Sequence, residues 1–439
     1  MTEQANKFYK SIKTKMDNSR STALLNGAVW VSAGIIGLSA VMYAKLISYF
    51  QTIFLSHFHD APILVSSLGP LLFVLATWLV RKFAPDAKGS GIPQVLTAIE
   101  QSSEHVGDDV FSWKSSLVSI KTAFIKIISS SVGILGGASI GREGPTVQIA
   151  AAGFTWFGNK VRRHVPNIEF KTFLVAGSAA GVAAAFNTPI AGITFAIEEL
   201  GGGALATVRQ VVLLAIIVSG VIAQGLAGDY LYFGHPTFPQ VDVSLLLIES
   251  ISIGIIGGLL GGVFAKILAE PHITKLPTHW IARAFIAGFL CSLIGYYTHG
   301  DTAGSGYEVT RDILNGGSIQ DVNMLFPIYK LATTILSYLS GMAGGIFSPS
   351  LSIGAGIGLS FAKILGLVNF KVCALIGMVA FFSGVVRAPL TAVIIVMEMT
   401  DEHMLTLPFM IAAYIAFSAG KIVMKEPLYH YLARKHLEG

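Results

Sequence analysis

The sequence consists largely of apolar segments that glycine and proline interrupt at intervals. A helix needs about 20 residues to cross a bilayer, and several of the apolar segments are shorter, among them 146–157 and 284–298. Irregular backbone at membrane depth is tolerated only where protein buries it or where it lines a cavity. The pattern therefore predicts an all-α polytopic membrane protein with broken, tilted helices, in which the breaks mark the transport pathway.

The low content of charged residues agrees with this prediction. Charged residues make up 13% of the 439 residues, against about 25% in typical soluble domains. This excludes a cytosolic enzyme and a nucleic-acid partner, even though the net charge is +5. The two cysteines, Cys291 and Cys373, both lie in apolar segments, which excludes a disulfide scaffold.

Basic residues flank the apolar part of the chain at both ends. Residues 1–21 carry five basic and two acidic residues, and the last apolar segment is followed by Lys421, Lys425, Arg434 and Lys435. Positive charge accumulates on the cytoplasmic side of membrane proteins. We therefore expect both termini in the cytoplasm, an even number of crossings, and no cleavable signal at the N-terminus.

Three short motifs recur in the same order along the chain. Residues 186–198 align without gaps with 386–398, residues 141–145 align with 345–349, and Gly89-Ser-Gly91 aligns with Gly304-Ser-Gly306. Interrupted helices at corresponding positions of two halves indicate the binding site in transporters. We expect an N-terminal segment over 1–21, repeats over 22–228 and 229–425, and a C-terminal tail over 426–439; the residues alone do not decide between inverted and parallel repeats.

Three of the breaks have the composition of an anion site. Residues 89–93, 141–145 and 345–349 each combine glycine with proline and lead into apolar helical sequence. The first N–H groups of a helix lack acceptors and carry a partial positive charge, which suits an anion. Three helix N-termini converging near mid-membrane would bind an anion without a full positive charge, and Ser90 would add a hydroxyl donor.

Acidic and basic residues within the apolar region are the next candidates. An acid at membrane depth is a functional candidate by default, and Glu143 at a helix N-terminus would occupy the anion site and leave it when protonated. The alternative is a permanent ion pair with Arg142. Glu198 and Glu199 form a second acidic pair, with solvated side chains as the alternative, and Lys126 is either a snorkelling lysine or a buried counter-charge.

Taken together, the motifs strongly resemble the CLC family of chloride channels and proton-coupled chloride transporters. The resemblance rests on the three pentapeptides that begin at Gly89, Gly141 and Gly345, on Phe186-Asn-x-Pro189, and on Pro427-Leu-Tyr429. It implies two inverted-topology repeats and a homodimer with one pathway per subunit. It also implies that Ser90, Tyr429 and the backbone amides of Ile346 and Phe347 bind the central chloride.

The same resemblance assigns the acids. Glu143 is similar to the external gate and proton acceptor of the family, Glu199 to the internal proton-transfer residue of its exchangers, and Glu198 to the supporting acid beside it. The resemblance thus implies H+/Cl− exchange, and the alternative is a passive voltage- or pH-gated chloride channel of the same fold. Ser90 favours chloride as the substrate, with bromide or nitrate also carried.

Other classes of function find less support in the sequence. His57-Phe-His59-Asp60 is more typical of a wetted loop than of a metal site, and no metal or other cofactor is expected. An enzyme is not expected, because Gly89-Ser-Gly91 lacks the G-x-S-x-G frame of a nucleophile elbow, and the sequence has no H-E-x-x-H motif and no P-loop. The short stretch after Tyr429 predicts the absence of regulatory nucleotide-binding modules. This compact form resembles the prokaryotic members of the family, which implies a location in the inner membrane of a prokaryotic cell.

Overall fold

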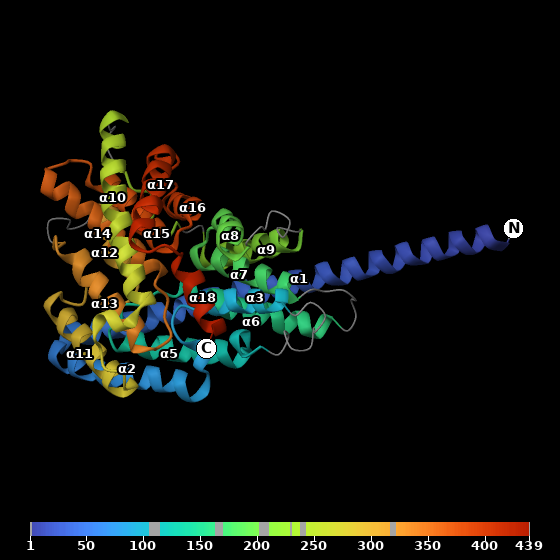
Figure 1. Ribbon diagram of the computed structural model, residues 1–439, viewed down its shortest axis with the longest axis horizontal. Coiled ribbons are helices and arrows are strands. Elements are labelled where there is room, and N and C mark those ends of the chain that lie inside the picture. Colours follow the sequence, from blue (N-terminus) through green and yellow to red (C-terminus); the bar gives the residue numbers. More distant parts are fainter. Residues whose placement is uncertain are drawn as a thin grey trace.

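The computed structural model describes residues 2–104, 115–162, 170–201, 210–228, 231–237, 243–316 and 322–438. Within these residues the chain forms helices and connecting loops, and two isolated β-bridges pair residues of different loops. Figure 1 shows the helices of the first half (blue to green) beside those of the second half (yellow to red). The helices of the first half are α1 (Thr2–Asp60), α2 (Pro62–Phe83), η1 (Pro85–Ala87), α3 (Ile92–Glu104), η2 (Ser116–Val118), α5 (Ile120–Leu135), α6 (Glu143–Val161), α7 (Phe170–Phe186), α8 (Pro189–Phe195), η3 (Ala196–Leu200) and α9 (Gln210–Ala227). Those of the second half are α10 (Val243–Ala269), η5 (Pro271–Thr274), α11 (Trp280–Tyr297), α12 (Tyr307–Asn315), α13 (Phe326–Ser340), α14 (Phe347–Leu365), α15 (Phe370–Val386), α16 (Pro389–Thr400), α17 (Thr406–Val423) and α18 (Leu428–Glu438).

The lengths of the helices confirm a polytopic membrane fold with broken helices. In the described residues, five helical segments are long and apolar enough to cross a membrane: Ala23–Asp60, Pro62–Phe83, Ser244–Ala269, Trp280–Tyr297 and Thr406–Val423. Phe170–Phe186, Phe370–Val386 and Pro389–Thr400 are apolar but shorter. These short helices come next to the breaks that the sequence predicts.

Corresponding breaks in the two halves have the same local structure. Asn187 follows α7 with φ 59°, and Arg387 follows α15 with φ 68°, which are left-handed conformations that commonly end a helix. Pro189 and Pro389 then begin α8 and α16, where a missing N–H costs nothing. The aligned motifs of the sequence therefore fold into equivalent turns.

Glycine allows the helices around the centre to approach closely. A Cβ on Gly354 of α14 would collide with the backbone of Gly377 on α15, and one on Gly258 of α10 would collide with Ala416 on α17. Close contact through small residues is the usual basis of helix association in membranes. The glycine content of the chain thus has a packing function as well as a role in the breaks.

Both ends of the chain are helical. α1 runs without a break from Thr2 to Asp60, across the predicted boundary at residue 21, which stays a prediction, and its N-terminal end projects from the other helices in Figure 1. The predicted C-terminal tail contains α18, which packs against α3, α10 and α15. Leu428 and Tyr429 are buried there, in a hydrophobic cluster to which both halves contribute.

Candidate anion-binding site

The three glycine-rich breaks join one another through backbone hydrogen bonds. The N–H of Gly89 donates to the carbonyl of Met342 at 2.9 Å, and the N–H of Gly344 donates to the carbonyl of Gly89 at 3.1 Å. Gly141 and Gly345 exchange both of their hydrogen bonds, at 2.7 and 2.8 Å. The starts of α3, α6 and α14 therefore meet at one place, as the sequence predicts.

A buried lysine fixes the first of these breaks. Lys126 on α5 is 0% exposed, and its Nζ donates to the carbonyl of Gly89 at 2.9 Å. Lys330, at the equivalent position of α13, donates to the carbonyl of Gly304 at 2.8 Å. The alternative of a snorkelling lysine is thus wrong for Lys126: both lysines hold a Gly-Ser-Gly loop from within the protein.

Ser90 and Tyr429 meet beside this junction, although they come from opposite ends of the chain. The side chain of Ser90 lies next to the hydroxyl of Tyr429, and both residues are buried. Neither hydroxyl oxygen has a hydrogen-bond partner in the described residues. Because an unpaired buried hydroxyl is costly, the pair is suited to donate to a ligand.

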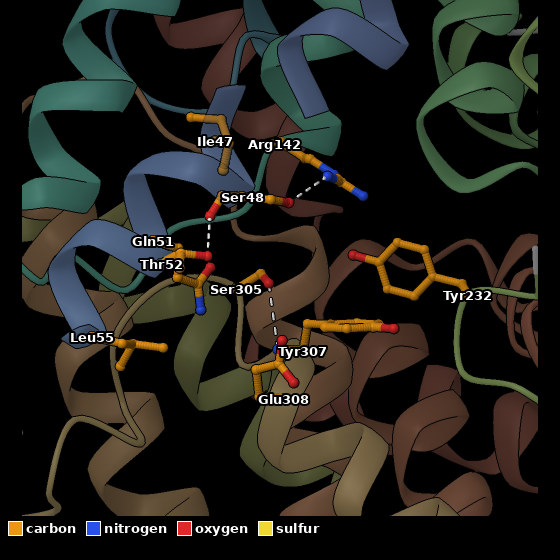
Figure 2. Close-up of a pocket in the computed structure, with 10 residues that line it drawn as sticks. All are labelled: Ile47, Ser48, Gln51, Thr52, Leu55, Arg142, Tyr232, Ser305, Tyr307 and Glu308. Carbon is orange, nitrogen blue, oxygen red and sulfur yellow. Dashed lines mark hydrogen bonds between the residues drawn. The ribbon is translucent and has the colours of Figure 1, made fainter. Parts of the chain in front are cut away.

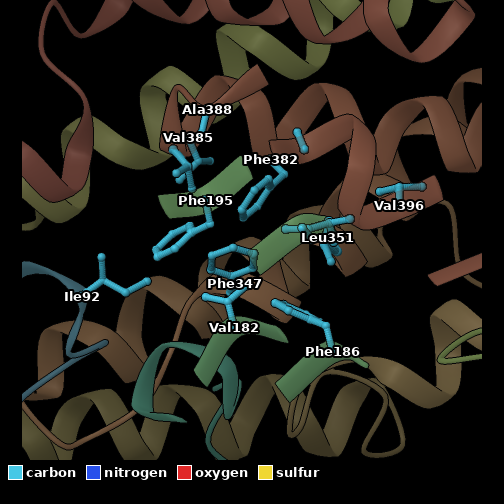
Figure 3. Packing of buried hydrophobic residues seen from close by; sticks show 14 of the residues in the cluster. Ile92, Val182, Phe186, Phe195, Phe347, Leu351, Phe382, Val385, Ala388 and Val396 are labelled. Carbon is cyan, nitrogen blue, oxygen red and sulfur yellow. The ribbon is translucent and has the colours of Figure 1, made fainter. Parts of the chain in front are cut away.

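Phe347 contributes backbone rather than side chain to the junction. Its ring packs against the rings of Phe186 and Phe382, with centroids 5.1 and 4.2 Å away, and Figure 3 shows it within this apolar cluster. Ile346 is the N-cap residue of α14, which begins at Phe347. The first N–H groups of α14 have no acceptor within the helix, which agrees with the amide role predicted for Ile346 and Phe347.

Glu143 begins α6 and is buried at the junction. Its side chain is 1% exposed, and neither carboxylate oxygen has a hydrogen-bond partner in the described residues. Nε of Arg142 lies 3.9 Å from Oε1 of Glu143, a contact without a hydrogen bond. Arg142 instead donates to the carbonyl of Ala44 at 3.0 Å, so the geometry does not favour a permanent ion pair.

A cavity of about 120 Å³ has Arg142 in its wall. Figure 2 shows Arg142 beside Ser48 at its wall, with Tyr232 across the cavity and Ser305 and Tyr307 below. Ser305 belongs to the second Gly-Ser-Gly loop. The two copies of this motif therefore have different surroundings: Ser90 is buried at the junction, whereas Ser305 lines an open cavity.

Glu199 is buried in a short π-helical segment, η3, which continues α8. Single π-turns are frequent at functional sites. Glu199 is 2% exposed, and its Oε1 lacks a hydrogen-bond partner in the described residues. Nε2 of His430 lies 3.9 Å from this oxygen, and the His430 side chain is 37% exposed. The alternative of a solvated Glu199 is thus wrong, and His430 lies between this acid and solvent.

Glu198 points in another direction. Its carboxylate accepts hydrogen bonds from the backbone N–H groups of Leu390 and Thr391, at 3.0 and 2.7 Å, and from the hydroxyl of Thr391 at 2.7 Å. Glu198 therefore caps the N-terminus of α16. Its predicted role as a supporting acid stays a prediction, and the structure adds a role in holding the two halves together.

The structure thus brings Ser90, Glu143, Ile346, Phe347 and Tyr429 to one junction. Glu199 and Glu143 both act electrostatically on the Tyr429 hydroxyl, so the two buried acids lie near the same group. Sequence reasoning missed His430, whose only signal was its place directly after Tyr429. In the described residues, no three His, Cys, Asp or Glu side chains form a metal-binding group, and the ring of His57 contacts the carbonyl of Ile53 at 2.9 Å.

Residues 72–421 match the family described as voltage gated chloride channel, Voltage_CLC. The chain belongs to the CLC family. The match includes Ser90, both buried acids and all three glycine-rich breaks, while Tyr429 lies just beyond it. The protein is accordingly an integral membrane protein of this family.

Solved structures of other CLC proteins have the same fold. A slow cyanobacterial Cl−/H+ antiporter has a TM-score of 0.80 at 24% identity, and the match covers 94% of this chain and 98% of that one. A CLC-type fluoride/proton antiporter has a TM-score of 0.77 at 23% identity, with 91% and 96% covered. A eukaryotic CLC transporter has a TM-score of 0.77 at 20% identity, with 94% and 74% covered. At these identities the likeness concerns the fold.

Proposed function

We propose that this CLC protein is a proton-coupled chloride antiporter. Chloride occupies the junction of α3, α6 and α14 and receives hydrogen bonds from Ser90, Tyr429 and the first amides of α14. Glu143 is the gate on the predicted extracellular side, and Glu199 relays protons from the cytoplasmic side. Membership of a chloride channel family supports the substrate, and the unpaired hydroxyls of Ser90 and Tyr429 support the site.

One observation carries the proposal of coupling. Glu143 and Glu199 are both buried, both have a carboxylate oxygen without a hydrogen-bond partner, and both act on Tyr429. An unpaired carboxylate in a low-dielectric environment is expensive, so its presence indicates a function. A passive pore has no use for a second buried acid. Two acids on either side of one anion site are what alternating proton and anion binding requires.

The chemistry of the gate follows from charge. Ionised Glu143 lies at the N-terminus of α6, where the helix dipole and the free amides favour an anion. Its carboxylate and a chloride ion therefore compete for the same place. Protonation neutralises Glu143 and opens the place to chloride, so each passage of chloride is linked to the uptake or release of a proton.

The test is proton movement in proteoliposomes that hold a chloride gradient, with the voltage held near zero by potassium and valinomycin. A chloride gradient that drives protons uphill would support the antiporter. Chloride flux without proton movement would instead support the alternative, a passive channel of the same fold. The absence of chloride flux would contradict the substrate.

The remaining features belong to the same proposal. Bromide and nitrate pass the site as well, which anion replacement in the same assay tests. The protein forms a homodimer with one pathway per subunit, which is the assembly that the family resemblance implies. The mass of the purified protein in detergent tests this.

Both termini lie in the cytoplasm of a prokaryotic cell, which protease protection in inverted membrane vesicles tests.

A further inference from the structure

Three basic side chains converge on a recess at the end of α2. The recess has a volume of about 180 Å³, and its wall includes Arg81, Lys88 and Arg283 together with Thr77 and Gly341. Arg81 comes from the last turn of α2, Lys88 from the segment between η1 and α3, and Arg283 from the first turns of α11. No residue of this wall is acidic.

The positive charge of the recess is not balanced within it. Nε of Arg283 is buried and has no hydrogen-bond partner in the described residues. Desolvation, together with the positive charges of Arg283 and Arg81, lowers the pKa of Lys88. Asp86 on η1 is close in sequence but does not belong to the wall. An anion that enters the recess reduces the repulsion between these like charges, and it provides an acceptor for the unpaired N–H of Arg283.

Aromatic residues place this recess at the surface of the membrane. The guanidinium of Arg81 lies 5.4 Å from the centre of the Trp280 ring, and Nζ of Lys82 lies 4.8 Å from that of Trp78. Tryptophan is enriched at membrane–water interfaces, and lysine and arginine at the cytoplasmic ends of crossing helices. The recess therefore opens where the headgroups of the cytoplasmic leaflet lie.

We propose that this recess binds the phosphate group of an anionic phospholipid. Arginine recognises phosphate through two parallel N–H donors, and basic recesses between membrane helices on the cytoplasmic side are known to suit lipid headgroups. The exposed apolar side chains beside the recess, Phe83 and Ile281, offer contacts to acyl chains that a free phosphate would not use. The proposal is independent of proton coupling.

The experiment measures the melting temperature of the full chain, delipidated in a neutral detergent, as phosphatidylglycerol is added. The wild type is expected to melt at higher temperature with phosphatidylglycerol and to change less with phosphatidylcholine. Each of R81Q, K88Q and R283Q weakens the apparent affinity for phosphatidylglycerol by about fivefold. Native mass spectrometry of the same samples counts retained lipid and does not depend on the melting transition.

The matched control is K275Q/K421Q/K425Q, which removes three exposed lysines outside the recess. This variant is expected to bind phosphatidylglycerol like the wild type, whereas R81Q/K88Q/R283Q does not. Equal affinity in the two triple variants, or equal affinity of the wild type for both lipids, would overturn the proposal. Full competition by millimolar glycerol phosphate would also overturn it, because it would identify free phosphate as the ligand.

Discussion

Glu198 and Glu398 lie 200 residues apart, and each caps the helix that carries the other. Glu198, at the end of the α8–η3 segment, accepts hydrogen bonds from the first amides of α16. Glu398, near the end of α16, accepts hydrogen bonds from the N–H groups of Ile190 and Ala191 in α8, at 3.2 and 2.7 Å. The two helices must run in opposite directions for this exchange. A carboxylate is well placed at a helix N-terminus, so the reciprocal caps join the two halves.

Removal of either cap is expected to destabilise the protein. Glu198→Ala and Glu398→Ala each leave the first amides of a helix without their acceptor, which lowers the free energy of unfolding by about 1–2 kcal/mol. The melting temperature in detergent measures the loss. Glu426→Ala is the control, because it removes a surface ion pair with Arg434, and such pairs contribute little. Equal melting temperatures for all three variants would contradict the capping role.

Glu198→Gln separates the cap from the predicted role in proton transfer. The amide oxygen still accepts a hydrogen bond from α16, but the side chain no longer exchanges protons. If Glu198 acts only as a cap, proton and chloride fluxes in proteoliposomes stay in their wild-type ratio. That is the expected result. A selective fall in proton flux would instead support the supporting acid that the family resemblance implies.

The parts of the site that the sequence predicts are those written as short contiguous motifs. The glycine-rich breaks, Ser90 and Glu143 each lie within such a motif, and the order of the motifs indicates that they belong together. The contacts of Glu198, Lys330 and His430 depend on residues that are remote in sequence, which no local pattern reveals. The unbroken α1 was missed because a charged segment followed by an apolar one marks the membrane boundary, whereas a helix continues across it.

Glu143→Gln tests the gate. The amide has the size of the protonated acid and carries no charge, so the N-terminus of α6 is left open to chloride. We expect continued chloride flux and no proton movement under a chloride gradient, measured with a chloride electrode and a pH electrode on the same vesicles. Coupled pumping by this variant would exclude Glu143 as the gate.

Glu199→Ala tests the proton path from the other side. The substitution removes the buried carboxylate but leaves Ser90, Tyr429 and the amides of α14 in place. Chloride flux is therefore expected to continue while proton transport stops. Unchanged proton flux would remove Glu199 from the path, and loss of both fluxes would be checked against the melting temperature to detect misfolding.

His430→Gln tests whether the exposed imidazole supplies protons to Glu199. Glutamine keeps a polar group near Oε1 of Glu199 but does not titrate, so proton flux is expected to fall while chloride flux in a Glu143→Gln background is unchanged. His430 faces Glu100 on α3 as well as Glu199. His430→Asn, equally unable to titrate, is expected to behave in the same way. Wild-type proton flux in both variants would exclude the imidazole from the path.

Burial of His430 also gives the stability of the wild-type protein a pH dependence of defined sign. α18 follows the last membrane-spanning helix, and burial lowers the pKa of His430 below 6.5, opposed in part by the carboxylate of Glu100 and the backbone of Glu199. Unfolded protein then binds this proton more readily than folded protein, so stability falls as the pH decreases through 6.5. The difference in melting temperature between pH 7.5 and pH 5, values chosen to lie on either side of about 6.5, is expected to be smaller for His430→Gln. An equal or larger difference in melting temperature for His430→Gln would contradict the contribution assigned to His430.

Gly144→Ala tests how closely α6 approaches the serine of the anion site. A Cβ on Gly144 would overlap the hydroxyl of Ser90 and lie 3.0 Å from its backbone carbonyl, so Ser90 must move. Overpacking of this kind costs about 1–3 kcal/mol, which corresponds to a loss of about fivefold to about 100-fold in chloride flux if the whole cost falls on the chloride site. Gly225→Ala on α9 is the matched control, because no atom lies within 4 Å of its added Cβ. Equal chloride flux in both variants would show that Ser90 does not depend on this contact.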